Sequence, residues 1–239
     1  MRTLKGEDWF NLGDKDLALH VLRTHALKQD VSLTTITASV ARRFGITAQV
    51  LPMTDDPVRT MLETDEGTLE FQRYFVERRA EPVVSGIRYM NAEIARPNQQ
   101  VLAALRDPLL EAVVICPSNP WLSVAPLLAM PDLYQALRRT RAPVVAVSPI
   151  VAGKAIKGPT AKLMRELNLP VDAVSVARYY GDMLDGFVLD DTDRTLCAEV
   201  EDLGFAATTA QTVMIDDTAK RDLAIEVLAF AQSLRNPRQ

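Results

Sequence analysis

The stretch AVVICPSNP at residues 112–120 is a short hydrophobic strand that runs directly into a turn rich in polar groups. A second stretch, PVVAVSPIVAGKAIKGP at residues 143–159, follows the same plan. Each strand leads through a loop into a helical pattern, which predicts strands of one parallel sheet. Loops at the carboxyl edge of such a sheet, beside helix N-termini, favour anionic ligands. An anionic, nucleotide-like ligand at this edge is the first expectation.

Strand and helix patterns alternate from residue 83 onward, as in a parallel α/β sheet. The expected strands are 83–89, 112–116, 143–147, 173–176, 186–189 and a segment near 209–214, and the expected helices are 97–105, 124–139, 160–167 and 218–234. Upstream, the pattern predicts helices beginning at Asp14 and Ser32, a strand at 47–51, a hairpin over 58–69 and a helix over 71–79. The expected domains are a helical and hairpin subdomain, 1–82, and an α/β core, 83–239.

The composition is that of an ordinary globular protein. The 239 residues are 24% charged and 48% hydrophobic, enough for one good core or two small ones. A net charge of -4 and a pI of about 5.3 argue against a protein devoted to nucleic-acid binding. Two cysteines and two histidines are too few for an ordinary zinc site. Without a secretory or membrane-spanning pattern, a reducing cytoplasm is the expected compartment.

Polar side chains in the two loops are the first candidates for ligand binding. Ser118 and Asn119 can donate hydrogen bonds to a phosphate or ribose, although Ser and Asn before Pro also form ordinary turns. Ser148 opens the second loop. Lys154 and Lys157 can steady pyrophosphate oxygens as point charges, or can simply be solvated surface lysines.

A Pro-bounded loop upstream carries adjacent acids. Thr54, Asp55 and Asp56 can hold Mg²⁺, which takes one or two carboxylates and keeps several waters. An Asp-Asp-Pro sequence is equally a turn or helix-cap signal. Arg59 follows this loop and can bind a substrate carboxylate through two parallel hydrogen bonds, or can pair with Asp55.

Five motifs, in order along the chain, resemble those of the 2-phospho-L-lactate transferase family. They are LPMTDDPVRT at 51–60, CPSNP at 116–120, SPIV at 148–151, KGP at 157–159 and ARYYGD at 177–182. The resemblance extends from about Trp9 to the C-terminus. It implies an α/β fold with a Rossmann-like parallel sheet and an inserted helical and β-hairpin subdomain.

The resemblance also implies an activity in coenzyme F420 biosynthesis. A phospholactyl, phosphoenolpyruvyl or related phosphoacyl group would pass from a guanosine diphosphate carrier to the terminal hydroxyl of the deazaflavin Fo, releasing GMP. The expected cofactor is Mg²⁺, the expected assembly a homodimer, and neither nucleic acid nor membrane is an expected partner. Asp55 and Asp56 are the expected catalytic and metal-holding residues. Arg178 and Tyr180, with Tyr179, would line the deazaflavin or guanine, although aromatic residues are more often core.

The sequence departs from the family pattern in two places. Family members begin with a strand and a glycine-rich turn that cradles the nucleotide phosphates, whereas Met1 aligns inside the family's chain. An N-terminal part is therefore expected to be absent, and transfer by this chain alone is expected to be slow or absent. Asn11 stands where the family commonly carries Arg or Lys against Fo, and it brings no charge. The alternative functions are a non-catalytic nucleotide-sugar binding protein of the gluconeogenesis-factor type, or an inactive fragment.

Overall fold

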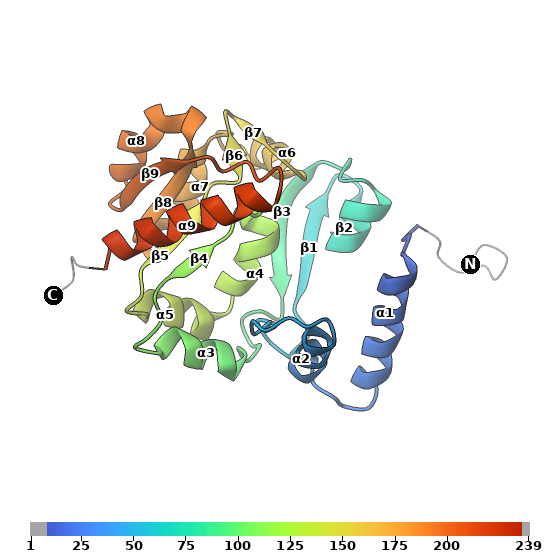
Figure 1. Cartoon of the computed structure of the whole chain (residues 1–239). Coiled ribbons are helices and arrows are strands. Elements are labelled where there is room, and N and C mark those ends of the chain that lie inside the picture. The colour runs from blue at the N-terminus through green and yellow to red at the C-terminus, as the bar shows by residue number, and fades with distance from the viewer. Residues whose placement is uncertain (1–8, 236–239) are drawn as a thin grey trace. The chain divides into compact units, whose positions relative to one another are not determined.

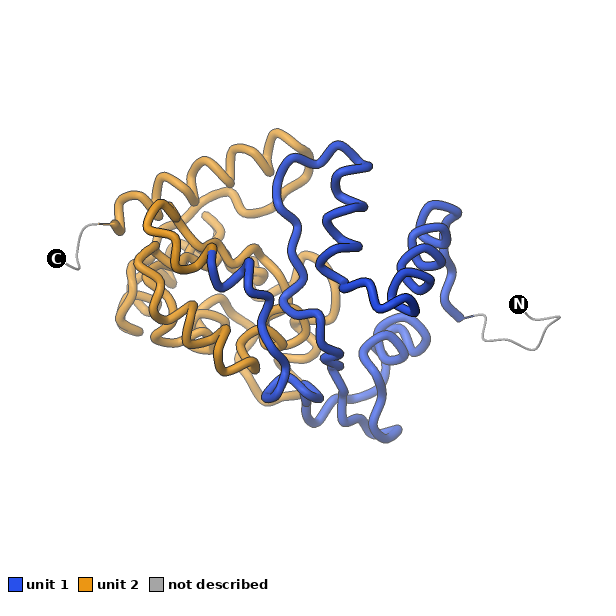
Figure 2. Tube along the Cα trace, turned by 90° about the horizontal axis from the view of Figure 1, so that it is seen from below, with its two compact units in different colours: residues 1–103 blue, residues 104–239 orange. Residues whose placement is uncertain are grey.

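The chain divides into two compact units, Met1–Ala103 and Ala104–Gln239 (Figure 2). The structure, a computed structural model, describes residues 9–235. The division falls later in the chain than the expected boundary at residue 82, because the strand that follows this boundary pairs within the first unit. Over the described residues, no helix combines the length and apolar character needed to cross a membrane.

Unit 1 combines two helices with a three-stranded antiparallel sheet (Figure 1). Its elements are α1 (Asp14–Leu27), α2 (Leu33–Arg43), β1 (Arg59–Thr64), β2 (Gly67–Glu70), the π-helix η2 (Arg73–Glu77), β3 (Val84–Met90) and the start of α3 (Gln99–Arg106). The α2 helix begins where predicted, because the Ser32 side chain accepts a hydrogen bond from the Thr35 backbone N–H at 3.2 Å. The predicted hairpin is confirmed by the antiparallel pairing of β1 with β2.

Two predicted strands are wrong, and a third lies in the other sheet. The strand expected at 83–89 belongs to the antiparallel sheet, as β3 beside β1, and not to the parallel one. Its partly exposed residues, which include Ser85, Gly86 and Arg88, suit a sheet with one wet face, whereas parallel strands are usually buried on both faces. Residues 47–51 form no strand. Residues 173–176 are helical, because the Asp172 side chain caps the helix by accepting from the Ser175 N–H at 2.7 Å.

Unit 2 is built on a four-stranded parallel sheet with strand order β4-β5-β8-β9 (Figure 1). Its strands are β4 (Val113–Ile115), β5 (Val144–Val147), β8 (Gly186–Asp190) and β9 (Ala206–Ala210), with the small hairpin β6 (Ile150–Val151) and β7 (Lys154–Ala155). Its helices are α4 (Ala125–Leu128), α5 (Pro131–Arg139), α6 (Thr160–Glu166), α7 (Ala173–Tyr180), α8 (Cys197–Glu201) and α9 (Asp217–Ser233), with the shorter turns η3 (Pro120–Val124), η4 (Gly181–Met183) and η5 (Asp191–Leu196). The expected α/β class and parallel sheet are confirmed, and the expected helix over 124–139 is broken before Pro131.

The α9 helix packs closely on one face of this sheet (Figure 1). Leu223, Val227 and Ala231 of α9 join the core cluster of β5 and β8. The approach is closest at Gly186, where an added Cβ would lie 2.6 Å from the Phe230 ring and 2.7 Å from a Leu234 methyl. The absence of a side chain at this first position of β8 therefore sets the spacing between helix and sheet.

Asp190 fixes the carboxyl end of β8. One carboxylate oxygen accepts from the N–H and hydroxyl of Thr192, at 3.0 and 2.8 Å. The other accepts from the N–H and hydroxyl of Thr212, also at 3.0 and 2.8 Å. Burial by itself raises the pKa of this carboxyl, but the hydrogen bonds from Thr192 and Thr212 outweigh burial and hold the pKa below its ordinary value.

Gly186→Ala should destabilise the chain, because the new methyl must displace Phe230 and Leu234. We expect the free energy of unfolding to fall by about 1 to 3 kcal/mol in urea denaturation. Gly86→Ala in β3 is the matched control, because its Cβ would meet only Glu63, at an ordinary 3.6 Å. Equal effects of the two substitutions would contradict the close approach of α9.

Asp190→Asn should lower the free energy of unfolding by about 1 to 3 kcal/mol at pH 7, because the amide NH₂ that replaces one carboxylate oxygen would face the N–H donor of Thr192 or of Thr212 and leave that donor without an acceptor. Since the folded-state pKa lies below the unfolded value of about 3.9, this stabilisation is complete above pH 4 and is lost as the pH falls through the folded pKa. The gap between wild type and variant should therefore shrink below pH 4 in acid denaturation. The exposed Asp191→Asn is the control, and a gap that stays constant would contradict the assignment.

Candidate functional site

The carboxyl edge of the unit 2 sheet gathers the loops that the sequence singled out. Strands β4, β5 and β8 are parallel neighbours, so the segments that follow them emerge at one edge. Ser118 and Asn119 follow β4, Ser148 follows β5, and Asp190 ends β8. The order of the strands thus brings together loops that are far apart in the sequence.

The two ends of the Asn119 side-chain amide differ, because its oxygen accepts hydrogen bonds and its nitrogen makes none within the described residues. It precedes η3, and its carbonyl oxygen accepts from the N–H groups of Trp121 and Leu122, both at 3.0 Å. Its Nδ2 is buried and has no hydrogen-bond partner within residues 9–235. A buried donor without an acceptor is costly, and such groups commonly await a ligand or an ordered water. The oriented amide therefore marks a place for an acceptor such as a phosphate, ribose or carbonyl oxygen.

Aromatic side chains border the same turn. The rings of Trp121 and Tyr179 lie 5.2 Å apart, and those of Tyr179 and Tyr180 lie 5.7 Å apart. Tyr180 is buried, and burial, with a smaller effect of Tyr179, raises the pKa of its hydroxyl above the ordinary value. Tyr179 and Arg178 are exposed at the end of α7, so Tyr179 offers more ring surface than Tyr180. Sequence reasoning omitted Trp121, although an aromatic residue directly after CPSNP was a usable signal.

In the loop that follows β5, the hydroxyl of Ser148 is hydrogen-bonded, whereas the ammonium groups of Lys154 and Lys157 are exposed. Ser148 is buried, and its hydroxyl donates to the Ile150 carbonyl at 2.8 Å and accepts from the Ile150 N–H at 3.1 Å. Lys154 on β7 and Lys157 before α6 are exposed, and neither forms an ion pair with any described carboxylate. Ser148 thus shapes the turn, while the lysines are available to an anion.

In unit 1, Thr54 and Asp55 hold the predicted acidic loop in place. The buried Thr54 hydroxyl donates to the Arg96 carbonyl at 2.6 Å and accepts from the Asp56 N–H at 3.0 Å. Asp55 accepts from the Thr34 N–H at 2.7 Å and from its hydroxyl at 2.9 and 3.0 Å. Because Thr34 lies in the first turn of α2, Asp55 places its negative charge at a helix N-terminus.

Only one of the two carboxylate oxygens of Asp56 accepts a hydrogen bond from the described residues. Its Oδ2 accepts from the Arg96 N–H at 2.8 Å and lies 3.6 Å from the Arg96 Nε. The backbone hydrogen bond is the main cause that lowers the pKa of this carboxyl. Its Oδ1 accepts no hydrogen bond from the described part of the chain. Both acids border a cavity of about 440 Å³ that Thr34 and Asn98 also line.

The remaining predicted residues of unit 1 are exposed. Arg59 begins β1 and makes no ion pair with Asp55. Asn11 lies in the extended segment before α1. Across residues 9–235, no group of three or more His, Cys, Asp or Glu side chains is arranged to hold a metal ion. Two carboxylates remain compatible with Mg²⁺, which often takes only one or two protein carboxylates and completes its shell with waters and phosphates.

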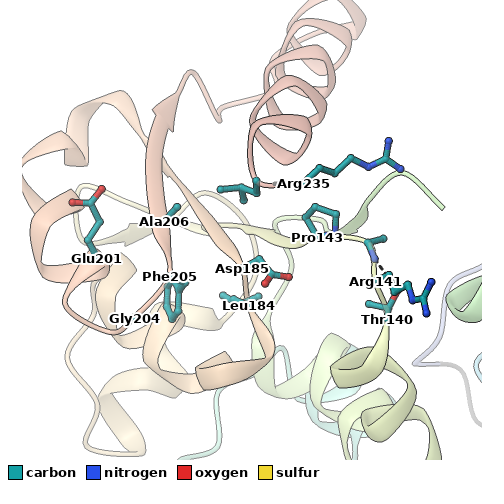
Figure 3. A pocket seen from close by; sticks show the side chains of 12 residues that line it. Thr140, Arg141, Pro143, Leu184, Asp185, Glu201, Gly204, Phe205, Ala206 and Arg235 are labelled. Carbon is teal, nitrogen blue, oxygen red and sulfur yellow. Dashed lines mark hydrogen bonds between the residues drawn. The ribbon is translucent and has the colours of Figure 1, made fainter. Parts of the chain in front are cut away.

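A larger cavity, of about 1230 Å³, lies at the opposite edge of the unit 2 sheet (Figure 3). Pro143, Asp185 and Phe205, which precede β5, β8 and β9, contribute to its wall. Figure 3 shows Arg141 and Arg235 on one side of this cavity and Glu201 on the other. None of the predicted site residues lines it.

The chain matches known proteins over nearly its whole length. Residues 4–231 match the family described as 2-phospho-L-lactate transferase CofD. A 2-phospho-L-lactate transferase of Methanosarcina mazei is 38% identical over 231 residues, which are 96% of this chain and 75% of that protein. A phosphoenolpyruvate transferase of Kitasatospora aureofaciens is 34% identical over 97% of this chain and 73% of its own length.

Solved structures agree on the fold. A crystal structure of a UPF0052 family member from Bacillus halodurans aligns with a TM-score of 0.57 at 14% identity, covering 92% of this chain and 75% of that one. At this identity the likeness concerns the fold alone. The family match, which extends over most of the sequence, shows that the chain belongs to the 2-phospho-L-lactate transferase family CofD.

Proposed function

We propose that this transferase moves a phospholactyl, phosphoenolpyruvyl or related phosphoacyl group from a guanosine diphosphate carrier to the deazaflavin Fo, in coenzyme F420 biosynthesis. Membership of the CofD family and the names of the relatives support a phosphoacyl transferase. The observation that carries the assignment of the nucleotide is the buried, unpaired Nδ2 of Asn119 at the carboxyl edge of the parallel sheet.

The reaction requires recognition of an anion and stabilisation of the leaving group. The acceptor hydroxyl oxygen forms the new bond to phosphorus, its proton departs, and the diphosphate P–O bond breaks to release GMP. In this proposal the Asn119 Nδ2 donates to a phosphate or ribose oxygen of the carrier. Lys154 and Lys157 neutralise charge on the departing phosphate, where an unpaired cation is most effective. Trp121 and Tyr179 supply an aromatic surface for a base or deazaflavin ring.

The unit 1 residues have separate proposed roles. When bound, Mg²⁺ would offset negative charge on phosphate oxygens. Asp56 is the better candidate to hold it, because its Oδ1 is unengaged, whereas both oxygens of Asp55 accept from Thr34. Arg59 is exposed and able to bind the carboxylate of the transferred phosphoacid through two hydrogen bonds. Asn11 would contact Fo without adding charge.

Asn119→Asp should weaken ligand binding while it preserves the cap of η3. Aspartate keeps the oxygen that caps η3 but replaces the Nδ2 donor with a second oxygen, which repels phosphate. We expect GDP to bind the wild-type chain in calorimetry, and the variant to lose about 1 to 3 kcal/mol of binding free energy, or roughly 10- to 100-fold in affinity.

The control is Ser123→Ala, which alters a side chain further along the same segment without touching the Asn119 amide. Unchanged GDP affinity in a folded Asn119→Asp variant would remove Asn119 from the site. Phosphoacylated Fo and GMP, measured by mass spectrometry after incubation with the guanylyl donor, Fo and Mg²⁺, would separate the transferase from the nucleotide-sugar binding protein. Because transfer by this chain alone is expected to be slow or absent, only the appearance of product decides, and it would exclude the nucleotide-sugar binding protein.

Asp55→Asn and Asp56→Asn should have different effects on metal affinity and on the free energy of unfolding. We expect Asp56→Asn to weaken Mn²⁺ binding, followed by electron paramagnetic resonance as a probe of the Mg²⁺ site, by at least about five-fold, because the free carboxylate oxygen becomes part of a neutral amide. Asp55→Asn should instead lower the free energy of unfolding by less than about 1 kcal/mol through the lost charge at the α2 N-terminus. If both variants bind Mn²⁺ as wild type does, the acidic loop is a structural turn.

A further inference from the structure

The hairpin that carries Lys154 turns at a residue with an unfavourable backbone conformation. Strands β6 and β7 are joined by Ala152 and Gly153, and the register pairs Val151 with Lys154. Ala152 has a φ of 48° and Gly153 a φ of 70°. Positive φ at both central residues is typical of a type I′ turn, whose first position ordinarily holds Asn, Asp or Gly. Because a Cβ disfavours the left-handed region, another contact must hold Ala152 in this conformation.

The Asp193 carboxylate makes this contact. Its Oδ2 and Oδ1 accept from the Ala152 N–H at 2.9 and 3.2 Å. Asp193 is only 8% exposed, and among residues 9–235 its carboxylate accepts no other hydrogen bond and forms no ion pair. A buried carboxylate is costly unless it is hydrogen-bonded. Since its hydrogen bonds go to the turn alone, holding the turn is the structural role of this side chain.

Asp193 is itself fixed to the parallel sheet. It lies in η5, which begins directly after Asp190 at the end of β8. Asp190 accepts from the N–H groups of Thr192 and Thr212, so the residue before Asp193 is held against the sheet. The hairpin also touches its surroundings, because β6 contacts β8 and α7, and β7 contacts α6 (Figure 1). A continuous set of contacts therefore joins the carboxyl edge of β8 to the turn before Lys154.

We propose that Asp193 is a positioning residue for Lys154. This inference rests on the proposed function, in which Lys154 neutralises charge on the departing phosphate. By holding Ala152 in the left-handed region, Asp193 fixes where β7 begins and therefore where the Lys154 backbone lies. Lysine is a point charge on a flexible stem, so a fixed backbone restricts the positions that its ammonium can reach. Asp193 does not touch the nucleotide, and its negative charge alone would oppose an anion, so its contribution is geometric.

Asp193→Ala should weaken GDP binding measured by calorimetry at low ionic strength. Removing a negative charge should by itself tighten the binding of an anion, so a weaker affinity identifies the lost position of Lys154 as the cause. We expect Asp193→Ala and Lys154→Ala each to lower GDP affinity about five-fold, which is the size of a partly screened ion pair. Asp191→Ala is the matched control, because it removes an exposed acid of the same η5 segment that pairs with Arg194. It should bind GDP no more weakly than the wild type does.

The outcomes separate this inference from the proposed function. Wild-type chain that does not bind GDP would overturn the proposed function and the role of Asp193 with it. A loss of affinity in Lys154→Ala but not in a folded Asp193→Ala would overturn the positioning role alone. Equal affinity in both variants and the wild type would remove Lys154 from the site. If Asp193→Ala does not fold, Ala152→Val perturbs the same turn, because a β-branched residue tolerates positive φ poorly, and it should weaken GDP binding equally. Unchanged affinity in Ala152→Val would then overturn the inference.

Double variants test whether Asp193 acts through the turn and through Lys154. Asp193→Ala/Lys154→Ala should bind GDP like either single variant, whereas independent effects would multiply to a loss of about 25-fold and would overturn the inference. Asp193→Ala/Ala152→Gly should recover wild-type affinity, because glycine adopts positive φ without support. Asp193→Asn keeps an oxygen that accepts from the Ala152 N–H, so it should also bind GDP like the wild type. A loss in a folded Asp193→Asn, or no recovery with Ala152→Gly, would show that Asp193 acts otherwise than by holding the turn.

Discussion

The parallel pairing of β5 between β4 and β8 is the constraint on which the candidate site depends. Val113 of β4 is in register with Val144, and Val145 of β5 is in register with Gly186. Because this register fixes where each strand ends, the segments after the three strands start at the same edge. The core that holds the register is apolar, with every residue of β5 and β8 buried, while the polar groups appear only where the strands stop.

Much of unit 2 could be predicted because its strands are short hydrophobic runs bounded by turn residues, which is a local signal. The β3 strand was assigned to the wrong sheet because the sequence pattern shows that a strand exists without showing its partner, and β3 pairs with β1 across the intervening β2 and η2. Residues 173–176 were misread because their apolar run suits a strand or a buried helix equally. The hydrogen bond that the Asp172 side chain accepts from the Ser175 N–H favours the helix, so this local cap residue was a usable signal in the sequence.

The sequence predicted which loops form the candidate site, but not which side-chain atoms are available to a ligand. The position of Asn119 after a strand indicated a ligand. Only the structure shows that its oxygen caps η3 and that its Nδ2 has no hydrogen-bond partner within the described residues. The acids differ for a similar reason. Asp55 and Asp56 are adjacent residues of the same type, but Asp55 accepts hydrogen bonds from Thr34 and Asp56 accepts one from Arg96. Both partners are distant in the chain, so no local pattern distinguishes the two carboxylates.

The α1 helix shows that helical periodicity does not by itself place a side chain in the core. Leu17, Val21 and Leu22 recur at helical spacing, which is typical of a buried face, yet they are 52%, 59% and 58% exposed, and no residue of α1 is buried. The half-buried residues of α1 include His20 and Arg23, whose side chains are bonded at 2.8 Å. Burying an aliphatic side chain is worth about 1.5 to 3 kcal/mol, and within the described residues most of that stabilisation is not realised at the three positions. The spacing of apolar residues thus indicates a helix, whereas the packing of neighbouring elements decides which of its faces is covered.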